Sequence, residues 1–207
     1  MKLQLALDRL TRGECFRILE ETKEAIDWIE VGTGVIKEYG MTIVREIREL
    51  YPNHTIVADM KTCDAGKHEA KQAFEAGADI VTVMAFSANQ TITDTLAVAQ
   101  RYQKSIMIDL LGVTEQKRLI ELEQLGVKLV SLHFGKDMQQ EGELSTDLFS
   151  LVKADASFEV SVAGGINEHS LPSMVNQKPD IIIVGSAITG AEHPQEAALK
   201  LKGMMKE

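Results

Sequence analysis

The chain has 207 residues, of which 44% are hydrophobic and 26% charged, and its formal net charge is −9 at pH 7. This composition is ordinary for a globular protein with one sizeable core, so we expect residues 1–207 to form a single domain. The negative charge argues against nucleic acid as a partner, because an acidic surface repels phosphate backbones.

The two cysteines, Cys15 and Cys63, have no metal-ligand spacing, which is typical of a reducing compartment. The first residues contain no apolar run long enough for a signal peptide or a membrane span. We therefore expect a cytoplasmic protein without a membrane partner.

Short apolar segments alternate with segments of helical periodicity along the chain. The apolar segments predict eight strands, at residues 3–8, 27–31, 55–59, 79–84, 105–110, 128–133, 159–163 and 180–184. Regular alternation of strands and helices predicts a parallel sheet. An open dinucleotide-binding sheet would place a glycine-rich turn after its first strand, where this chain has Asp8-Arg9-Leu10. We therefore predict α/β architecture with a single (β/α)₈ (TIM) barrel, of nearly minimal length.

Helix boundaries are indicated by capping residues and glycines. Thr11 followed by Glu14 predicts a capping box at the start of the first helix. Gly77 and Gly126 are suited to the left-handed position that ends a helix. The polar segment 136–146 is a candidate lid or substrate loop. Further helix starts are expected at Asp64, Asn89, Thr114, Asn167 and Pro194.

Ionisable residues stand at the ends of five predicted strands. The carboxyl ends of barrel strands form the active site in barrel enzymes. Helix capping or surface pairing explains one such residue more easily than five, because each charge is costly inside a protein unless it is paired. We therefore predict one shared site, with a purely structural ring of caps and ion pairs as the alternative. The residues are Asp8, Glu30, Asp59, Lys61, Asp109 and His133.

The segment from Asp59 to Asp64 is the most specific part of this ring. Strand alternation places Asp59 and Lys61 on one face, where a lysine held by carboxylates suits stabilisation of developing negative charge. A salt-bridge cluster with a helix cap explains the segment equally well. Glu30 and Asp59 lie on adjacent strands and are suited to share a Mg²⁺ ion. His133 ends an apolar strand and is a candidate general acid or base.

The last two predicted strands end in glycine turns. They read Ala-Gly164-Gly165-Ile and Val-Gly185-Ser186-Ala. These are the places where such barrels commonly bind phosphate through backbone N–H groups. A phosphorylated substrate is therefore expected, although a glycine turn by itself is a weak signal.

Taken together, these motifs resemble the 3-hexulose-6-phosphate synthases, which belong to the orotidine 5′-monophosphate decarboxylase group of barrels. The resemblance extends from residue 3 to about residue 197. It is carried by Leu-Ala-Leu-Asp8, Ile-Glu30-Val-Gly-Thr33, Ala-Asp59-Met-Lys61-Thr-Cys-Asp64, His133-Phe-Gly-Lys-Asp137, Ala-Gly164-Gly165-Ile and Val-Gly185-Ser-Ala-Ile.

The resemblance implies a Mg²⁺-dependent aldol reaction of formaldehyde with D-ribulose 5-phosphate, giving D-arabino-hex-3-ulose 6-phosphate. By the same resemblance Glu30 and Asp59 are metal ligands, and Lys61 with Asp64 stabilises an enediolate. His133 moves the C1 proton. Asp109, from the same ring of strand-end residues, is also assigned to the catalytic set. A homodimer is implied, with Asp64 reaching into the neighbouring site. Asp8 corresponds to a residue that binds substrate hydroxyls, and Gly165, Gly185 and Ser186 correspond to phosphate contacts.

The related 3-keto-L-gulonate-6-phosphate decarboxylases are the alternative. They typically carry glutamate at the position of Asp109 and arginine at the positions of Lys136 and Ser186. These differences favour the synthase without excluding the decarboxylase, because both reactions pass through an enediolate. A non-catalytic sugar-phosphate-binding barrel is a third possibility, which would be expected to lack part of the ring, whereas this sequence keeps all of it.

Overall fold

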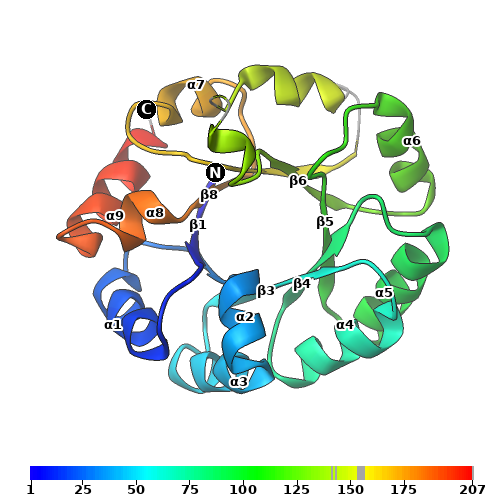
Figure 1. Cartoon of the computed structure of the whole chain (residues 1–207), viewed down its shortest axis with the longest axis horizontal. Coiled ribbons are helices and arrows are strands. Elements are labelled where there is room, and N and C mark those ends of the chain that lie inside the picture. The colour runs from blue at the N-terminus through cyan, green and yellow to red at the C-terminus, as the bar shows by residue number, and fades with distance from the viewer. Residues whose placement is uncertain (141, 143, 153–156, 207) are drawn as a thin grey trace.

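The computed structural model describes residues 1–140, 142, 144–152 and 157–206. Eight parallel strands close into a barrel in the order of the sequence, from β1 to β8, and helices surround it (Figure 1). The predicted single (β/α)₈ barrel is therefore confirmed. The strands are β1 (Lys2–Leu7), β2 (Trp28–Val31), β3 (Thr55–Thr62), β4 (Ile80–Met84), β5 (Ser105–Asp109), β6 (Leu129–His133), β7 (Glu159–Ala163) and β8 (Ile181–Val184).

Most strands are followed by an α-helix that covers the outside of the barrel. Two helices, separated at Gly40, follow β2, and two short 3₁₀ segments follow β6: η1 (Met138–Gln140) and η2 (Thr146–Leu151). The α-helices are α1 (Arg12–Thr22), α2 (Thr33–Tyr39), α3 (Met41–Leu50), α4 (Gly66–Glu75), α5 (Asn89–Tyr102), α6 (Gln116–Gln124), α7 (Leu171–Val175), α8 (Ser186–Thr189) and α9 (Pro194–Met204).

The capping box predicted from Thr11 and Glu14 is present at the start of α1. The helix starts at Asn89 and Pro194 are confirmed. The start predicted at Asp64 is wrong, because left-handed Ala65 immediately precedes α4.

Two further predicted starts are also wrong. The helix predicted at Thr114 begins at Gln116, after the extended residue Glu115. The helix predicted at Asn167 begins at Leu171, since the Asn167 side chain instead accepts N–H bonds within the preceding turn.

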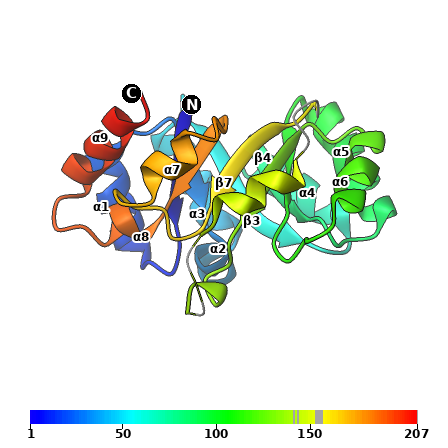
Figure 2. The same cartoon turned by 90° about the horizontal axis from the view of Figure 1, so that it is seen from above.

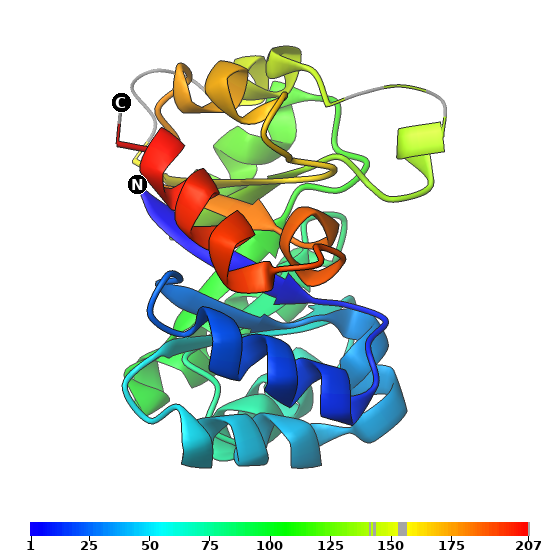
Figure 3. The same ribbon diagram turned by 90° about the vertical axis from the view of Figure 1, so that its left-hand side faces the viewer.

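The apolar side chains form two layers of core. The outer layer lies between strands and helices, whereas the inner layer fills the barrel with residues such as Trp28, Val57, Met107 and Leu129. Because the interior is filled, only the two ends of the barrel can accommodate polar sites. Figures 2 and 3 show both chain termini at one end and the η1 segment projecting at the other, where the strands finish.

Aspartates at the amino ends of three even-numbered strands tie them to the preceding strands. Asp27 accepts the N–H of Leu3 at 2.7 Å, and Asp79 accepts that of Ile56 at 2.8 Å. Asp180 accepts the N–H of Val160, also at 2.8 Å. Asp27 is paired with Lys202, and Asp79 with Arg48 and Lys104. These carboxylates close the amino end of the barrel.

Within the described residues, no helix has the length and apolarity needed to cross a membrane. Cys15 is buried and Cys63 exposed, and both are free thiols. Burial raises the pKa of the Cys15 thiol to about 11, so it remains protonated at neutral pH.

Candidate active site

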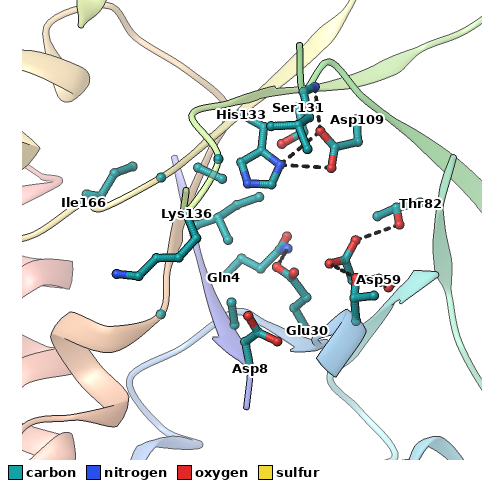
Figure 4. Close-up of a pocket in the computed structure, with 18 of the residues that line it drawn as sticks. Gln4, Asp8, Glu30, Asp59, Thr82, Asp109, Ser131, His133, Lys136 and Ile166 are labelled. Atoms are coloured by element: carbon teal, nitrogen blue, oxygen red, sulfur yellow. Dashed lines mark hydrogen bonds and ion pairs between the residues drawn. The ribbon is translucent and has the colours of Figure 1, made fainter. Parts of the chain in front are cut away.

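A cavity of about 300 Å³ opens at the carboxyl ends of the strands (Figure 4). The structure brings nearly all of the predicted site residues to this cavity, although they come from seven different parts of the barrel. The predicted residues that line it are Asp8, Glu30, Asp59, Lys61, Asp109, His133, Gly165, Gly185 and Ser186.

Lys61 lies between two carboxylates. Its Nζ atom is 3.1 Å from Oδ2 of Asp59 and 2.8 Å from Oδ2 of Asp109. Burial alone would lower the pKa of Lys61, but the charges of Asp59 and Asp109 outweigh burial and raise it above its ordinary value. The site therefore holds a permanent ammonium charge that can face a developing anion. The predicted proximity of Lys61 to Asp59 is present, but the second carboxylate is Asp109 rather than Asp64.

His133 pairs with the same Asp109. Its Nδ1 lies 2.9 Å from Asp109 Oδ2, and the other ring nitrogen faces the cavity (Figure 4). Burial opposes the charged forms of both groups, yet their mutual hydrogen bond and attraction outweigh it. The pKa of His133 is raised, and that of Asp109 is lowered to about 2. A fixed imidazole whose second nitrogen faces the cavity can exchange a proton with a bound molecule.

Glu30 and Asp59 form an acidic wall opposite the imidazole. Both are buried, with 9% and 7% of their surface exposed. Burial and the charge of Asp59 raise the pKa of Glu30 to about 8. A hydrogen bond from Gln4 Nε2 to Glu30, at 2.6 Å, partly offsets this rise in the pKa. Gln4 Oε1 is buried without a partner among the described residues.

This acidic wall could hold a cation. Burial and the neighbouring charge of Asp59 disfavour the ionised form of Glu30, and a hard cation would relieve that cost. Within the described part of the chain, no group of three or more His, Cys, Asp or Glu side chains is arranged to bind a metal. A bound ion would therefore need water or substrate oxygens in addition to Glu30 and Asp59.

The two glycine turns form the wall after β7 and β8. Gly164 has φ +124°, and a Cβ there would come within 2.3 Å of the carbonyl oxygen of Phe134, so this position requires glycine. Gly165 has φ +66° and Gly185 directly precedes α8. Backbone N–H groups and the Ser186 hydroxyl are therefore available to an anionic group at this edge of the cavity.

Asp64 is the predicted residue that the structure does not bring to the cavity. It is exposed and does not cap α4, and Lys61 is instead bound by Asp59 and Asp109. Asp8 lies at the rim, where its Oδ1 accepts the N–H of Gly34 at 3.1 Å.

Several residues of the cavity were missed by the sequence analysis. Thr82 donates to the Asp59 carboxylate at 2.8 Å, and Gln4 donates to Glu30. The Thr33 hydroxyl lies 2.7 Å from both the carboxylate and the carbonyl oxygen of Asp59. Lys136 and Gln139, which also line the cavity, belong to the segment 136–146 that was predicted as a lid or substrate loop; residues 141 and 143 of that segment lie outside the described residues. A threonine in an apolar strand is too ordinary to be singled out, whereas Gln4 inside Leu-Gln-Leu was a visible polar interruption.

An acid–base cluster beside glycine turns at the carboxyl end of a (β/α)₈ barrel is the arrangement expected for the active site of a barrel enzyme. Comparison with known proteins agrees with this assignment as a barrel enzyme. The family model described as "Orotidine 5'-phosphate decarboxylase / HUMPS family" matches residues 1–201. The chain belongs to this family, and is accordingly a lyase-type enzyme.

Individual relatives cover almost the entire chain. A protein of Bacillus subtilis (strain 168) named 3-hexulose-6-phosphate synthase is 37% identical, over 99% of both chains. The crystal structure of 3-hexulose-6-phosphate synthase from Salmonella typhimurium has a TM-score of 0.96 at 35% identity, covering 100% of this chain and 99% of that one. The crystal structure of 3-keto-L-gulonate-6-phosphate decarboxylase from Vibrio cholerae has a TM-score of 0.89 at 30% identity, covering 99% and 97%.

Proposed function

We propose that the chain catalyses a Mg²⁺-dependent aldol condensation of formaldehyde with D-ribulose 5-phosphate, giving D-arabino-hex-3-ulose 6-phosphate. The observation that carries the proposal is the arrangement of Lys61, Asp109 and His133, in which one buried carboxylate holds both a permanent cation and an imidazole. Proton abstraction next to a carbonyl needs both groups: a base for the proton and a positive charge for the electrons left behind.

The reaction begins at the imidazole. His133 removes a proton from C1 of ribulose 5-phosphate through the ring nitrogen that faces the cavity, while Asp109 holds the other nitrogen. The Lys61 ammonium stabilises the enediolate that forms. C1 then bonds to the carbon of formaldehyde, and the formaldehyde oxygen receives a proton, which His133 can return.

Glu30 and Asp59 are the proposed ligands of Mg²⁺. When bound, the ion would supply further positive charge for the oxygens of the enediolate. The raised pKa of Glu30 supports this assignment, because this buried carboxylate lies beside Asp59 without a sufficient counter-charge of its own.

The remaining residues are proposed to position the substrate. The N–H groups of Gly165 and Gly185 and the hydroxyl of Ser186 receive the phosphate, and Asp8 accepts from sugar hydroxyls at the rim. A homodimer in which Asp64 reaches the neighbouring site is also part of the proposal. The exposure of Asp64 and its position outside its own cavity support that arrangement.

The proposal is tested by formaldehyde consumption with ribulose 5-phosphate, with Mg²⁺ and after removal of divalent metal by a chelator. We expect turnover only with both substrates and metal. His133→Gln should lose turnover, whereas His169→Gln, on the exposed turn before α7, should keep it. Turnover unaffected by the chelator contradicts the metal, and unchanged turnover in His133→Gln contradicts the base.

Decarboxylation of 3-keto-L-gulonate 6-phosphate is the second candidate, favoured by the structural likeness to the enzyme of that name. Measurement of CO₂ release from this substrate distinguishes the two. We expect the condensation to be faster, because Asp109, Lys136 and Ser186 differ from the residues typical of the decarboxylases. Faster CO₂ release would make the decarboxylase the principal activity.

A further inference from the structure

The strand that carries Asp59 and Lys61 is irregular at the site itself. Ala58 of β3 pairs with Val81 of β4, but the next pair is Thr62 with Val83, so β3 carries two extra residues over this interval. Lys61 lies within the bulge and has φ +47°, in the left-handed region. A non-glycine residue in this conformation needs support from its surroundings.

Thr82, opposite the bulge on β4, provides that support. Its hydroxyl oxygen accepts the backbone N–H of Lys61 at 2.9 Å and lies 2.8 Å from Oδ1 of Asp59. A backbone N–H can only donate, so the single hydroxyl proton of Thr82 is left for the Asp59 carboxylate. The hydroxyl therefore joins the main chain of Lys61 to the side chain of Asp59; Figure 4 shows its contact with Asp59.

Thr33 completes the fixation from the other side. Its hydroxyl lies 2.7 Å from Oδ2 of Asp59, so each oxygen of that carboxylate faces one hydroxyl from a neighbouring element. Thr33 also lies 2.7 Å from the carbonyl oxygen of Asp59, whereas the hydroxyl of Thr82 bonds to the backbone N–H of Lys61 itself. Because only 4% of the surface of Thr82 is exposed, its hydrogen bonds are shielded from water. Hydrogen bonds to a charged group in a buried environment are stronger than ordinary ones.

We propose that Thr82 is a positioning residue, whose hydroxyl fixes Asp59 and Lys61 in the orientation that the reaction requires. This inference rests on the proposed function for its catalytic consequence. The simpler explanation is that Thr82 fills space as a β-branched strand residue. Valine would then serve equally well, because it has the same shape and lacks only the hydroxyl.

The two explanations are distinguished by Thr82→Val and Thr82→Ser. We expect Thr82→Val to lower kcat roughly 10- to 100-fold, the order caused by small misplacement of reacting groups, with little change in the KM for ribulose 5-phosphate. Thr82→Ser keeps the hydroxyl and should recover most of the activity. Thr22→Val removes another fully buried threonine hydroxyl, which bonds to Ile18 in α1, and should leave activity unchanged.

A second measurement does not depend on catalysis. Amide hydrogen exchange at Lys61, followed by NMR in the metal-free protein, should be at least tenfold faster in Thr82→Val than in wild type or Thr82→Ser. Wild-type kcat in folded Thr82→Val overturns the proposal, as does unchanged exchange at Lys61. If wild type consumes no formaldehyde, the proposed function fails, and exchange alone then decides whether Thr82 fixes the bulge.

Discussion

Acidic side chains gather at both ends of this barrel, but their surroundings differ. At the amino end, Asp79 receives a backbone N–H and two cationic side chains, and the pKa of Asp79 is lowered because these partners outweigh its partial burial. At the carboxyl end, burial and Asp59 raise the pKa of Glu30 to about 8. A carboxylate whose pKa is lowered by its partners, as in Asp79, stabilises the fold, whereas an ionised carboxylate whose pKa is raised by burial, as in Glu30, destabilises it.

The difference in charge pairing supports the assignment of the proposed active site to the carboxyl end. Buried charges persist only when they are paired or used, and the cluster at the carboxyl end is incompletely paired. Lys61 is shared by Asp59 and Asp109, which leaves Glu30 with an amide as its principal hydrogen-bond partner. A substrate or a cation can complete this cluster, while the amino end is already complete.

The largest expected effect comes from removing the shared lysine. Lys61→Ala should lower kcat about 10³-fold or more, because the positive charge next to the developing anion is lost. Far-ultraviolet circular dichroism should show an intact fold. The matched control is Lys202→Ala, which removes a lysine paired with Asp27 at the other end and should retain full turnover. Wild-type activity in Lys61→Ala would remove the charge role from the proposal.

Sequence reasoning predicted the strands well because buried parallel strands are continuous apolar runs. It also predicted most of the site, since strand ends converge in a closed barrel whatever the details of packing. The bulge at Lys61 and the role of Thr82 were not predictable, because threonine is a common strand residue and strict alternation hides an irregular register. The role of Asp79 in joining Ile56, Arg48 and Lys104 was likewise missed, since these partners come from segments that are distant in sequence.

The next effect concerns stability rather than activity. Asp79→Ala should lower the free energy of unfolding by about 2–4 kcal/mol, because it leaves the Ile56 N–H, Arg48 and Lys104 without their shared acceptor. Activity per folded molecule should not change. Glu159→Ala is the control: it breaks an exposed pair with Lys2, which is worth less than about 1 kcal/mol. Urea denaturation measures the free energy of unfolding of both variants. Equal losses of stability would show that the contacts of Asp79 contribute no more than an exposed ion pair.

At the carboxyl end, the stability of the metal-free protein should depend on pH through Glu30. Its pKa in the folded state is raised from 4.5 to about 8, so the folded protein binds more protons than the unfolded chain between these values. The contribution of Glu30 to stability is therefore complete below pH 4.5 and is lost as pH rises toward 8. The wild type should lose stability relative to Glu30→Gln over this range.

Thermal unfolding at pH 5 and pH 8 measures this difference. Added Mg²⁺ should restore stability at pH 8 in the wild type and have little effect in Glu30→Gln, because binding to the folded state alone is stabilising. A constant difference between the two proteins at both pH values would show that Glu30 is compensated without a cation, as Asp79 is.

The smallest effect is a shift in the titration of His133. Asp109 raises the pKa of the imidazole, so the protonated form persists to higher pH than in an ordinary histidine. Asp109→Asn removes the negative charge while an oxygen acceptor remains, and should lower the pKa of His133 toward its ordinary value. NMR titration measures this, with the His133 resonance assigned from its absence in His133→Gln. If His133 must be neutral to accept the C1 proton, the acidic limb of the rate profile moves to lower pH in the same variant. An unmoved titration would mean that Asp109 serves Lys61 alone, and the carboxyl end would then contain an ordinary ion pair of the kind found at the amino end.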